Sequence, residues 1–259
     1  MLNPISSAFK KAKQENRPAL LTYTVAGDSS KKQSLDILKS ISKNADILEL
    51  GVPHNTPVAD GSQIQTSAYR AIKNGIKVND IFKIVKDFKK FDKNKPIILM
   101  GYYNMIFQYG ENKFLNKCKS SGVNGLIVVD LPWPENRNFA KKCIKKSIYF
   151  IQLLSPTTTK VRLKKIIKDS HPMNYFISML STTGGKLKVS PNDILKNYTK
   201  IKKIDPNLKL YGPSKMNWKK ISEKHGIKYV SEVFSDRNYN EDLTLVDRKN
   251  ENSMITRVE

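Results

Sequence analysis

Short apolar segments alternate along the chain with longer segments in which apolar residues recur every three or four positions. The first kind of segment is typical of buried strands and the second of amphipathic helices. We expect strands at residues 19–25, 46–51, 96–102, 125–130, 148–154, 175–180, 208–212 and 227–234. We expect helices between them at residues 32–42, 62–75, 78–91, 113–121, 135–146, 158–169, 192–204 and 215–225. This order predicts repeated βα units and therefore a parallel sheet.

Eight such units in 259 residues predict an α/β fold of the (β/α)8 TIM barrel type, which typically takes about 250 residues. The alternative is an open, doubly wound sheet, but the turn "TVAGDSSKK" after the first strand lacks the glycine-rich dinucleotide fingerprint. No Pro/Gly/Ser-rich linker divides the chain, so we expect one barrel domain over residues 1–259. Its end, at about residues 235–259, is polar and weakly periodic, which leaves the eighth helix weakly defined.

The net charge of +23 raises the question of a nucleic-acid partner. Only seven of the 46 basic residues are arginine, and the lysines are scattered, whereas groove-reading proteins favour arginine concentrated on one face. We therefore expect no nucleic-acid partner. No apolar stretch approaches the roughly 20 residues of a membrane helix, and no signal-like segment begins the chain, so we expect a cytoplasmic protein without a membrane span. Cys118 and Cys143 lack metal-ligand spacing and are expected to be free thiols, with no metal bound.

The stretch "ILELGVPHNTPVADG" places Glu49 among apolar residues at the end of an expected strand and Asp60 in the loop that follows. In (β/α)8 barrels, catalytic groups lie at the C-terminal ends of strands and in the loops after them. Glu49 shares the direction of Ile47 and opposes Leu48 and Leu50, so both carboxylates can face one pocket. Apolar surroundings raise the pKa of a carboxyl group, which suits an acid and base near neutral pH. The alternative is a glutamate bonded to backbone amides and an aspartate that forms a turn with Gly61.

The stretches "LLTYTVAGD", "ADILELGVPHNTPVADGSQIQ", "MGYYNMIFQYGENKFLNKCKSSGVNGLIVVDLP" and "LLSPTTTKVRLKKI" resemble the tryptophan synthase alpha subunit family, over roughly residues 19 to 185. The resemblance implies a (β/α)8 lyase that cleaves indole-3-glycerol phosphate to indole and glyceraldehyde 3-phosphate. It also implies an alpha2-beta2 assembly with a beta subunit that holds pyridoxal phosphate. In this family the alpha subunit itself binds no cofactor and no metal.

By motif, Glu49 and Asp60 match the catalytic carboxylates of the family, Glu49 as acid and base and Asp60 as acceptor of the indole N–H. Other positions match or neighbour the family's indole pocket, namely Tyr23, Met100 (or Leu99), Tyr102, Val128 and Leu153. The stretches that meet the beta subunit in the family include here Asn55, Thr56, Asn104 and Asp130. A helix cap is the alternative role for Asp130.

The resemblance weakens in the loops that bind phosphate in the family. Gly184 and Gly212 match, but Lys186 and Leu187 replace a threonine and a glycine, and Glu232-Val233 replaces Gly-Ser. Lys186 or Lys215 is then expected to hold the phosphate as a point charge. In the loop after the second strand "HNTP" replaces "FSDP", so that Thr56 replaces an aspartate used in signalling to the beta subunit, and Ser178 stands in place of a pocket tyrosine. An alternative function follows, a catalytically weakened alpha-like subunit that mainly binds and supports the beta subunit.

Overall fold

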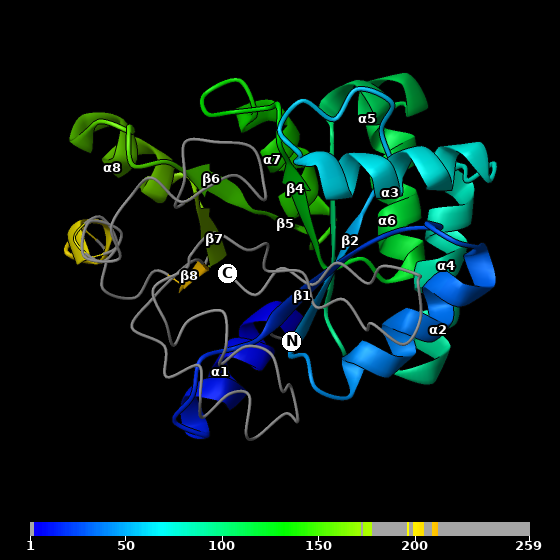
Figure 1. Ribbon diagram of the computed structural model, residues 1–259. Helices are drawn as coiled ribbons and strands as arrows, with labels where there is room; N and C mark the ends of the chain where they lie inside the picture. The colour runs from blue at the N-terminus through cyan, green and yellow to red at the C-terminus, as the bar shows by residue number, and fades with distance from the viewer. Residues whose placement is uncertain (1–2, 172, 178–195, 197–198, 205–208, 212–259) are drawn as a thin grey trace.

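The computed structural model describes residues 3–171, 173–177, 196, 199–204 and 209–211, and it contains a parallel sheet wrapped by helices (Figure 1). The strands are β1 (Leu21–Val25), β2 (Ile47–Gly51), β3 (Ile97–Gly101), β4 (Gly125–Val128), β5 (Tyr149–Phe150), β6 (Gln152–Leu154), β7 (Met173–Phe176) and β8 (Lys209–Tyr211). Neighbours in the chain are neighbours in the sheet, from β1 to β5 and from β6 to β8, and all pairs are parallel.

A single residue, Ile151, separates β5 from β6, and its backbone N–H donates to the carbonyl oxygen of Leu126 in β4 over 2.9 Å. The two short strands are therefore one barrel strand, which pairs with β4 at its start and with β7 at its end. This continuous parallel order is that of the predicted (β/α)8 barrel. The expected strand at 227–234 and the expected helix at 215–225 lie outside the described residues, as does the weakly defined end at 235–259.

The helices are α1 (Pro4–Gln14), α2 (Lys31–Ser42), α3 (Ser62–Lys73), α4 (Val78–Phe91), α5 (Tyr103–Tyr109), α6 (Glu111–Ser121), α7 (Arg137–Lys145) and α8 (Lys160–Lys168). The bounds of α4 coincide with the expected helix, and α2, α3, α6, α7 and α8 begin and end within two residues of theirs. Helices α1 and α5 were not expected. Helix α1 begins at Pro4, where a missing N–H costs nothing, and the Asn3 carboxamide accepts the N–H of Ile5 over 3.0 Å.

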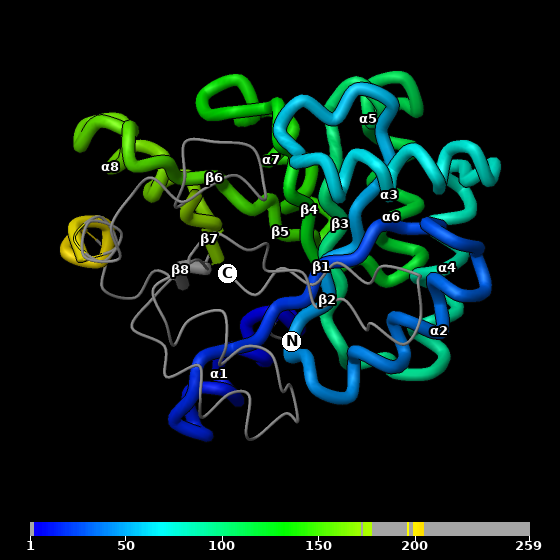
Figure 2. Tube along the Cα trace, in the orientation of Figure 1, coloured from blue at the N-terminus to red at the C-terminus, as the bar shows by residue number. Residues whose placement is uncertain are grey.

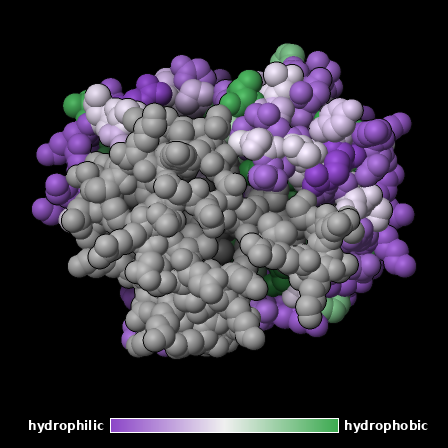
Figure 3. All heavy atoms as spheres, viewed as in Figure 1, coloured by the Kyte–Doolittle hydropathy of each residue, from purple (hydrophilic) through white to green (hydrophobic). Residues whose placement is uncertain are grey.

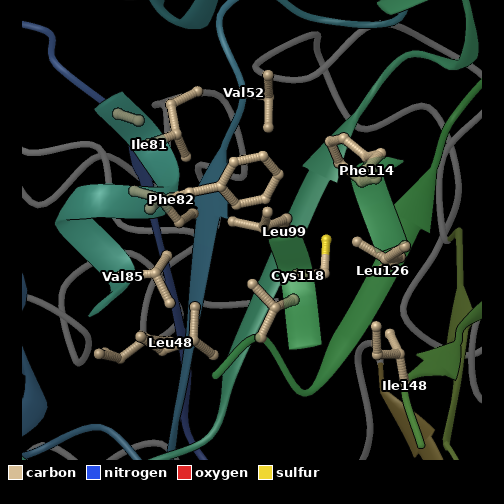
Figure 4. Close-up of a cluster of buried hydrophobic side chains, with 14 of the residues drawn as sticks. Leu48, Val52, Ile81, Phe82, Val85, Leu99, Phe114, Cys118, Leu126 and Ile148 are labelled. Carbon is tan, nitrogen blue, oxygen red and sulfur yellow. The ribbon is translucent and has the colours of Figure 1, made fainter. Parts of the chain in front are cut away.

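Two layers of apolar side chains pack on the opposite faces of the sheet. The outer layer lies between the strands and helices α2, α4, α6 and α7, and it includes Leu50. Leu48, Phe82 and Leu99 belong to the same layer (Figure 4). The inner layer fills the barrel and includes Ile47. Residues of β2 thus alternate between the two layers, as the period of a strand requires. Each large side chain that is fully buried in this way contributes roughly 1.5–3 kcal/mol relative to an exposed one.

Helix α1 covers the end of the barrel at which the strands begin (Figure 2). The Asn3 side chain donates to the carbonyl oxygen of Asn124, just before β4, over 3.2 Å. Ile5 is fully buried, and a methyl group added at Gly125 would come within 2.9 Å of its Cδ1 atom. This end is therefore packed with apolar side chains, and functional groups are to be sought at the other end.

The described surface in Figure 3 is mainly hydrophilic, with scattered apolar residues. Among the described residues, no helix is long and apolar enough to cross a membrane.

Candidate active site

Glu49 lies within β2, two residues before the strand ends, and only 1% of its surface is exposed. Its backbone neighbours are Tyr23 in β1 and Ile98 in β3. Both neighbours belong to the inner layer, as does Ile47, the residue two positions earlier in β2. The strand period therefore directs Glu49 to the inside of the barrel, as the sequence predicted. A carboxyl group at such a position is costly unless it is bonded or used in chemistry.

Asp60 lies at the end of the loop from β2 to α3, and 5% of its surface is exposed. Its backbone N–H donates to the carbonyl oxygen of Pro57 over 3.0 Å, and its carbonyl oxygen accepts the side-chain amide of Gln65 over 2.7 Å. Gly61 follows as the cap of α3. The carboxylate thus sits beside the N-terminus of this helix, where a negative charge is stabilised.

Tyr102 connects Asp60 to the neighbouring strand. It is the first residue after β3, and its hydroxyl group donates to Oδ2 of Asp60 over 3.2 Å and accepts the backbone N–H of Ala59 over 3.1 Å. Burial raises the pKa of this hydroxyl well above its usual range, and the charge of Asp60 raises it further. The phenol therefore stays protonated and remains a donor to the carboxylate. Glu49 lies in β2, which pairs with β3. The bond to Tyr102 therefore holds Asp60 at the end of the strand that neighbours Glu49.

His54 lies in the same loop, and its ring contacts the ring of Tyr102, with 4.7 Å between the centroids and an angle of 31° between the planes. Its Nδ1 atom accepts the backbone N–H of Thr56 over 3.0 Å. The loop is therefore attached to Tyr102 at residues 54, 59 and 60. The sequence interpretation noted the histidine only as part of the "HNTP" replacement, because nothing local to the loop reveals a contact with the end of β3.

Three of the predicted pocket residues lie on the inner side of the barrel. Tyr23 and Met100 belong to the inner layer, and Leu153 packs against it. The Tyr23 ring lies over Gly51, where an added methyl carbon would stand 2.2 Å from the hydroxyl oxygen. Gly51 thus leaves the space that this ring occupies beside the end of β2.

Val128 was predicted to line the pocket, but its side chain lies on the opposite face of the sheet. Val128 packs in the outer layer with Leu126, against the helices, whereas Ile127 belongs to the inner layer and Val129 packs against that layer. The strand period decides this placement, because adjacent residues of β4 point to opposite faces. Ile127 and Val129 therefore take the inward positions. The other aliphatic residue considered, Leu99, also packs in the outer layer.

Tyr175 is a candidate pocket residue that the sequence interpretation missed. It lies in β7 next to Leu153 of β6, belongs to the inner layer and is 5% exposed. The expected strand at 175–180 started two residues late, and the interpretation placed the pocket position at Ser178. The residues expected around the phosphate lie outside the described part of the chain, as does Ser178, namely Gly184, Lys186, Leu187, Gly212, Lys215, Glu232 and Val233.

The residues predicted to meet a partner lie near this end of the barrel. Asn55, Thr56 and Asn104 are exposed, in the loop after β2 and in α5. Asp130 is also exposed, and its Oδ1 atom accepts the backbone N–H of Tyr103 over 2.7 Å. Asp130 is thus a side-chain cap for the first turn of α5, which was the alternative role considered for it. The loop from β2 to α3 lies beside α5 at this end of the sheet (Figures 1 and 2).

The remaining candidate groups do not gather into a second centre. Within the described ranges, no set of three His, Cys, Asp or Glu side chains is placed to hold a metal ion. Cys118 and Cys143 are buried free thiols in the outer layer, and burial raises the pKa of both. His171 stacks on Tyr149 near the opposite end of the barrel, at the start of β5.

Comparison with known proteins finds a matching family model and a similar sequence. The family model for the tryptophan synthase alpha chain matches residues 9–221, and a second model, for the LamB/YcsF family, matches residues 191–259. The tryptophan synthase alpha chain of Pelagibacter ubique (strain HTCC1062) is 71% identical over 203 residues, which are 78% of this chain and 77% of the relative.

Solved structures show the same fold. Tryptophan synthase subunit alpha from Legionella pneumophila str. Paris superposes with a TM-score of 0.75 at 31% identity, over 82% of this chain and 79% of that one. A structure of the tryptophan synthase a2b2 complex from the hyperthermophile Pyrococcus furiosus matches with a TM-score of 0.69 at 34% identity, over 83% of this chain and 84% of that one.

Proposed function

Since the chain belongs to the tryptophan synthase alpha chain family, we propose that it cleaves indole-3-glycerol phosphate to indole and glyceraldehyde 3-phosphate. One observation carries the proposal for this particular chain. Two buried carboxylic side chains, Glu49 and Asp60, are held at the C-terminal ends of the paired strands β2 and β3, beside the apolar side chains of the inner layer. An apolar barrel interior suits an indole ring, and the carboxylic groups supply proton transfer.

Glu49 moves the protons in the proposed reaction. The bond to be broken joins indole C3 to the glycerol carbon that carries a hydroxyl group. Glu49 delivers a proton to indole C3 and takes the proton of that hydroxyl, and the electrons of the breaking bond return to the ring. The products are neutral indole and the aldehyde. A buried carboxyl group can serve both steps because apolar surroundings favour its protonated form, while loss of the proton restores the base.

Asp60 accepts the indole N–H while positive charge develops on the protonated ring. A carboxylate stabilises that charge more than a neutral group would, and the stabilisation grows as the charge grows. The Tyr102 hydroxyl and the N-terminus of α3 support the ionised form of Asp60. The cleavage needs only these proton movements, so we propose that the chain uses no cofactor and no metal of its own.

For the phosphate group of the substrate we propose Gly184, Gly212, Lys186 and Lys215. The support for these four is their place in the sequence, in the loops after the sixth and seventh expected strands. A lysine on a flexible stem is screened by salt more than oriented backbone amides are. The Michaelis constant for substrate is therefore expected to rise steeply with ionic strength. A Michaelis constant that salt leaves unchanged would contradict the role of the lysines.

We further propose that the chain assembles with a tryptophan synthase beta subunit, which carries the pyridoxal phosphate. Exposed residues at the catalytic end support a contact there: Asn55, Thr56 and Asn104, together with the apolar Val58 and Phe107, which are 70% and 66% exposed. Large exposed apolar side chains gathered near a site are typical of an interaction surface. The assembly belongs in the cytoplasm, where the buried thiols of Cys118 and Cys143 stay reduced. Co-elution of the two purified subunits in gel filtration at micromolar concentration tests this assembly.

The second candidate function, an alpha-like subunit that mainly supports the beta subunit, is favoured by the replacements at Lys186, Leu187, Glu232 and Val233. One assay separates the two candidates. The release of glyceraldehyde 3-phosphate from indole-3-glycerol phosphate is measured with the purified chain, alone and with a beta subunit.

The Glu49→Gln variant is measured in the same assay, and Glu15→Gln at the far end of α1 serves as the matched control. We expect turnover in the unchanged protein, a loss of about 10²- to 10⁴-fold for Glu49→Gln, and no loss for the control. Absence of turnover in the unchanged protein, together with co-elution with the beta subunit, would favour the supporting role.

A further inference from the structure

We propose that His54 is a positioning residue of the proposed lyase, which in its neutral form holds the loop that carries Asp60 and on protonation releases that loop. The proposal rests on the proposed function. It starts from one contact: Nδ1 of His54 accepts the backbone N–H of Thr56 over 3.0 Å. An imidazole nitrogen accepts a hydrogen bond only while it is unprotonated. This bond therefore exists only with the neutral side chain.

The same ring also contacts Tyr102, whose hydroxyl group holds both Ala59 and Asp60. The histidine thus connects the backbone at the middle of the loop to the side chain that orients the catalytic carboxylate. The segment from His54 to Asp60 is short, and its remaining backbone bonds are local, from Val58 to Thr56 and from Asp60 to Pro57. The Thr56 contact therefore fixes the conformation of the loop itself, while the bonds of Tyr102 attach the loop to the end of β3.

Protonation changes one of the two contacts of the ring and preserves the other. A cation is attracted to the face of a tyrosine ring, so the imidazolium can stay against Tyr102. The protonated Nδ1 carries a hydrogen that points at the N–H of Thr56, and two donors repel. The backbone at Thr56 must then move away from the ring. Asp60 is displaced with it, because only three residues separate the two in the loop.

Among the described residues, the ionisable groups that act on the stacked rings are Tyr102 itself, Asp60 in the same loop and Asp130 after β4. The charges of the two aspartates act on the Tyr102 hydroxyl. Tyr102 stays protonated throughout the range in which histidine titrates, because burial raises its pKa.

Two variants separate the two contacts. His54→Phe keeps a flat ring against Tyr102 and removes the acceptor. His54→Asn removes the ring and keeps an acceptor, because an asparagine side chain bonds the backbone N–H two residues ahead in the same way and does not titrate. If the acceptor matters, the two variants differ in activity at every pH, and neither shows the histidine titration.

The experiment measures kcat/KM for indole-3-glycerol phosphate from about pH 5 to pH 8, where histidines titrate. Nuclear magnetic resonance of the histidine ring protons gives the midpoint for His54, which the His54→Phe spectrum assigns among the three histidines of the chain. The hydrogen exchange rate of the Thr56 amide, corrected for its intrinsic pH dependence, reports the loop contact without any reaction.

We expect kcat/KM of the unchanged protein to fall about three- to tenfold on the acid side of the His54 midpoint, the factor that one hydrogen bond contributes. Exchange at Thr56 should accelerate at the same midpoint. Neither variant should show the fall in kcat/KM at low pH. The Thr56 amide should exchange fast at every pH in His54→Phe, and more slowly in His54→Asn. The proposal would be overturned if kcat/KM had the same pH dependence in the unchanged protein and in His54→Phe. It would also be overturned if the exchange rate of the Thr56 amide did not change at the His54 midpoint. Absence of cleavage at every pH would instead overturn the proposed function.

Discussion

The hydroxyl group of Tyr102 donates to the carboxylate of Asp60 over 3.2 Å, although 42 residues separate the two along the chain. The parallel pairing of β2 and β3 makes this possible, since it brings the end of β3 beside the loop that follows β2. The hydroxyl also accepts the N–H of Ala59, so one side chain fixes both the carboxylate and the backbone next to it. Asp60 is therefore oriented by the residue that follows a different strand, and its direction is set before substrate binds.

Tyr102→Phe is expected to lower kcat about three- to tenfold while the fold remains, because it removes a hydrogen bond to each of Asp60 and Ala59 and keeps the ring. Turnover and the thermal midpoint are measured together. Tyr109→Phe is the matched control, since its hydroxyl group donates to the side chain of Asn79 at the surface over 2.6 Å, at the end of α5. An unchanged kcat would show that Asp60 keeps its direction without Tyr102.

Asp60→Asn tests the charge of the carboxylate separately from its shape. The amide oxygen can still accept the Tyr102 hydroxyl, but it carries no charge to stabilise the positive indole ring. We expect kcat to fall by about 10²-fold or more, with a smaller change in the Michaelis constant. The same substitution at Asp87, a surface residue paired with Lys90, serves as control. A raised Michaelis constant at unchanged kcat would make Asp60 a substrate-binding residue and not a catalytic one.

Gly51→Ala is expected to displace Tyr23, because the new methyl carbon would lie 2.2 Å from the tyrosine oxygen and 2.6 Å from the ring carbon that bears it. Such overpacking typically costs about 1–3 kcal/mol in unfolding free energy. Activity should fall as well, since the ring lies beside Glu49 in the strand register. A double-mutant cycle measures the coupling: in a Tyr23→Leu background the cost of Gly51→Ala should be smaller. Equal costs in the two backgrounds would show that the ring does not set the space at Gly51.

Much of the fold could be predicted from the chain because its signals are local. Helix α4 follows the period of its own apolar residues from Val78 to Phe91, and no other element is needed to recognise it. The alternation in β2 likewise predicted that Glu49 shares the side of Ile47. The inner layer of the structure confirms this direction for the strand.

The features that the sequence left hidden depend on contacts between distant segments. Helix α5 is only seven residues long and receives its cap from Asp130, which lies beyond another strand. Val128 was assigned to the pocket by its match to the family motif, and the apolar run of β4 carries no polar residue that would have corrected its phase. Tyr175 was missed because the comparison by motif placed the pocket position at Ser178, three residues later in the same expected strand. A one-residue error of phase reverses every side chain of a strand.

His171 makes the stability of the protein depend on pH, at the end of the barrel away from the catalytic groups. Its ring stacks on Tyr149 with 4.7 Å between the centroids, and its buried Nε2 atom has no hydrogen-bond partner within the described ranges. Burial lowers its pKa below the usual 6.5. A protonated ring here would carry a charge and an N–H without an acceptor, which is costly in a buried place.

The sign of the effect follows from proton binding. Below about pH 6.5 the unfolded chain takes up a proton at this histidine while the folded protein resists it, so the unfolding free energy falls as the pH falls through the folded pKa. His171→Phe keeps the stacked ring and cannot titrate. Urea unfolding from pH 7 to pH 5 should therefore give a flatter dependence for the variant than for the unchanged protein, while acid effects of the carboxylates remain in both. Parallel curves for the two proteins would show that His171 is protonated in the folded state as easily as in the unfolded chain.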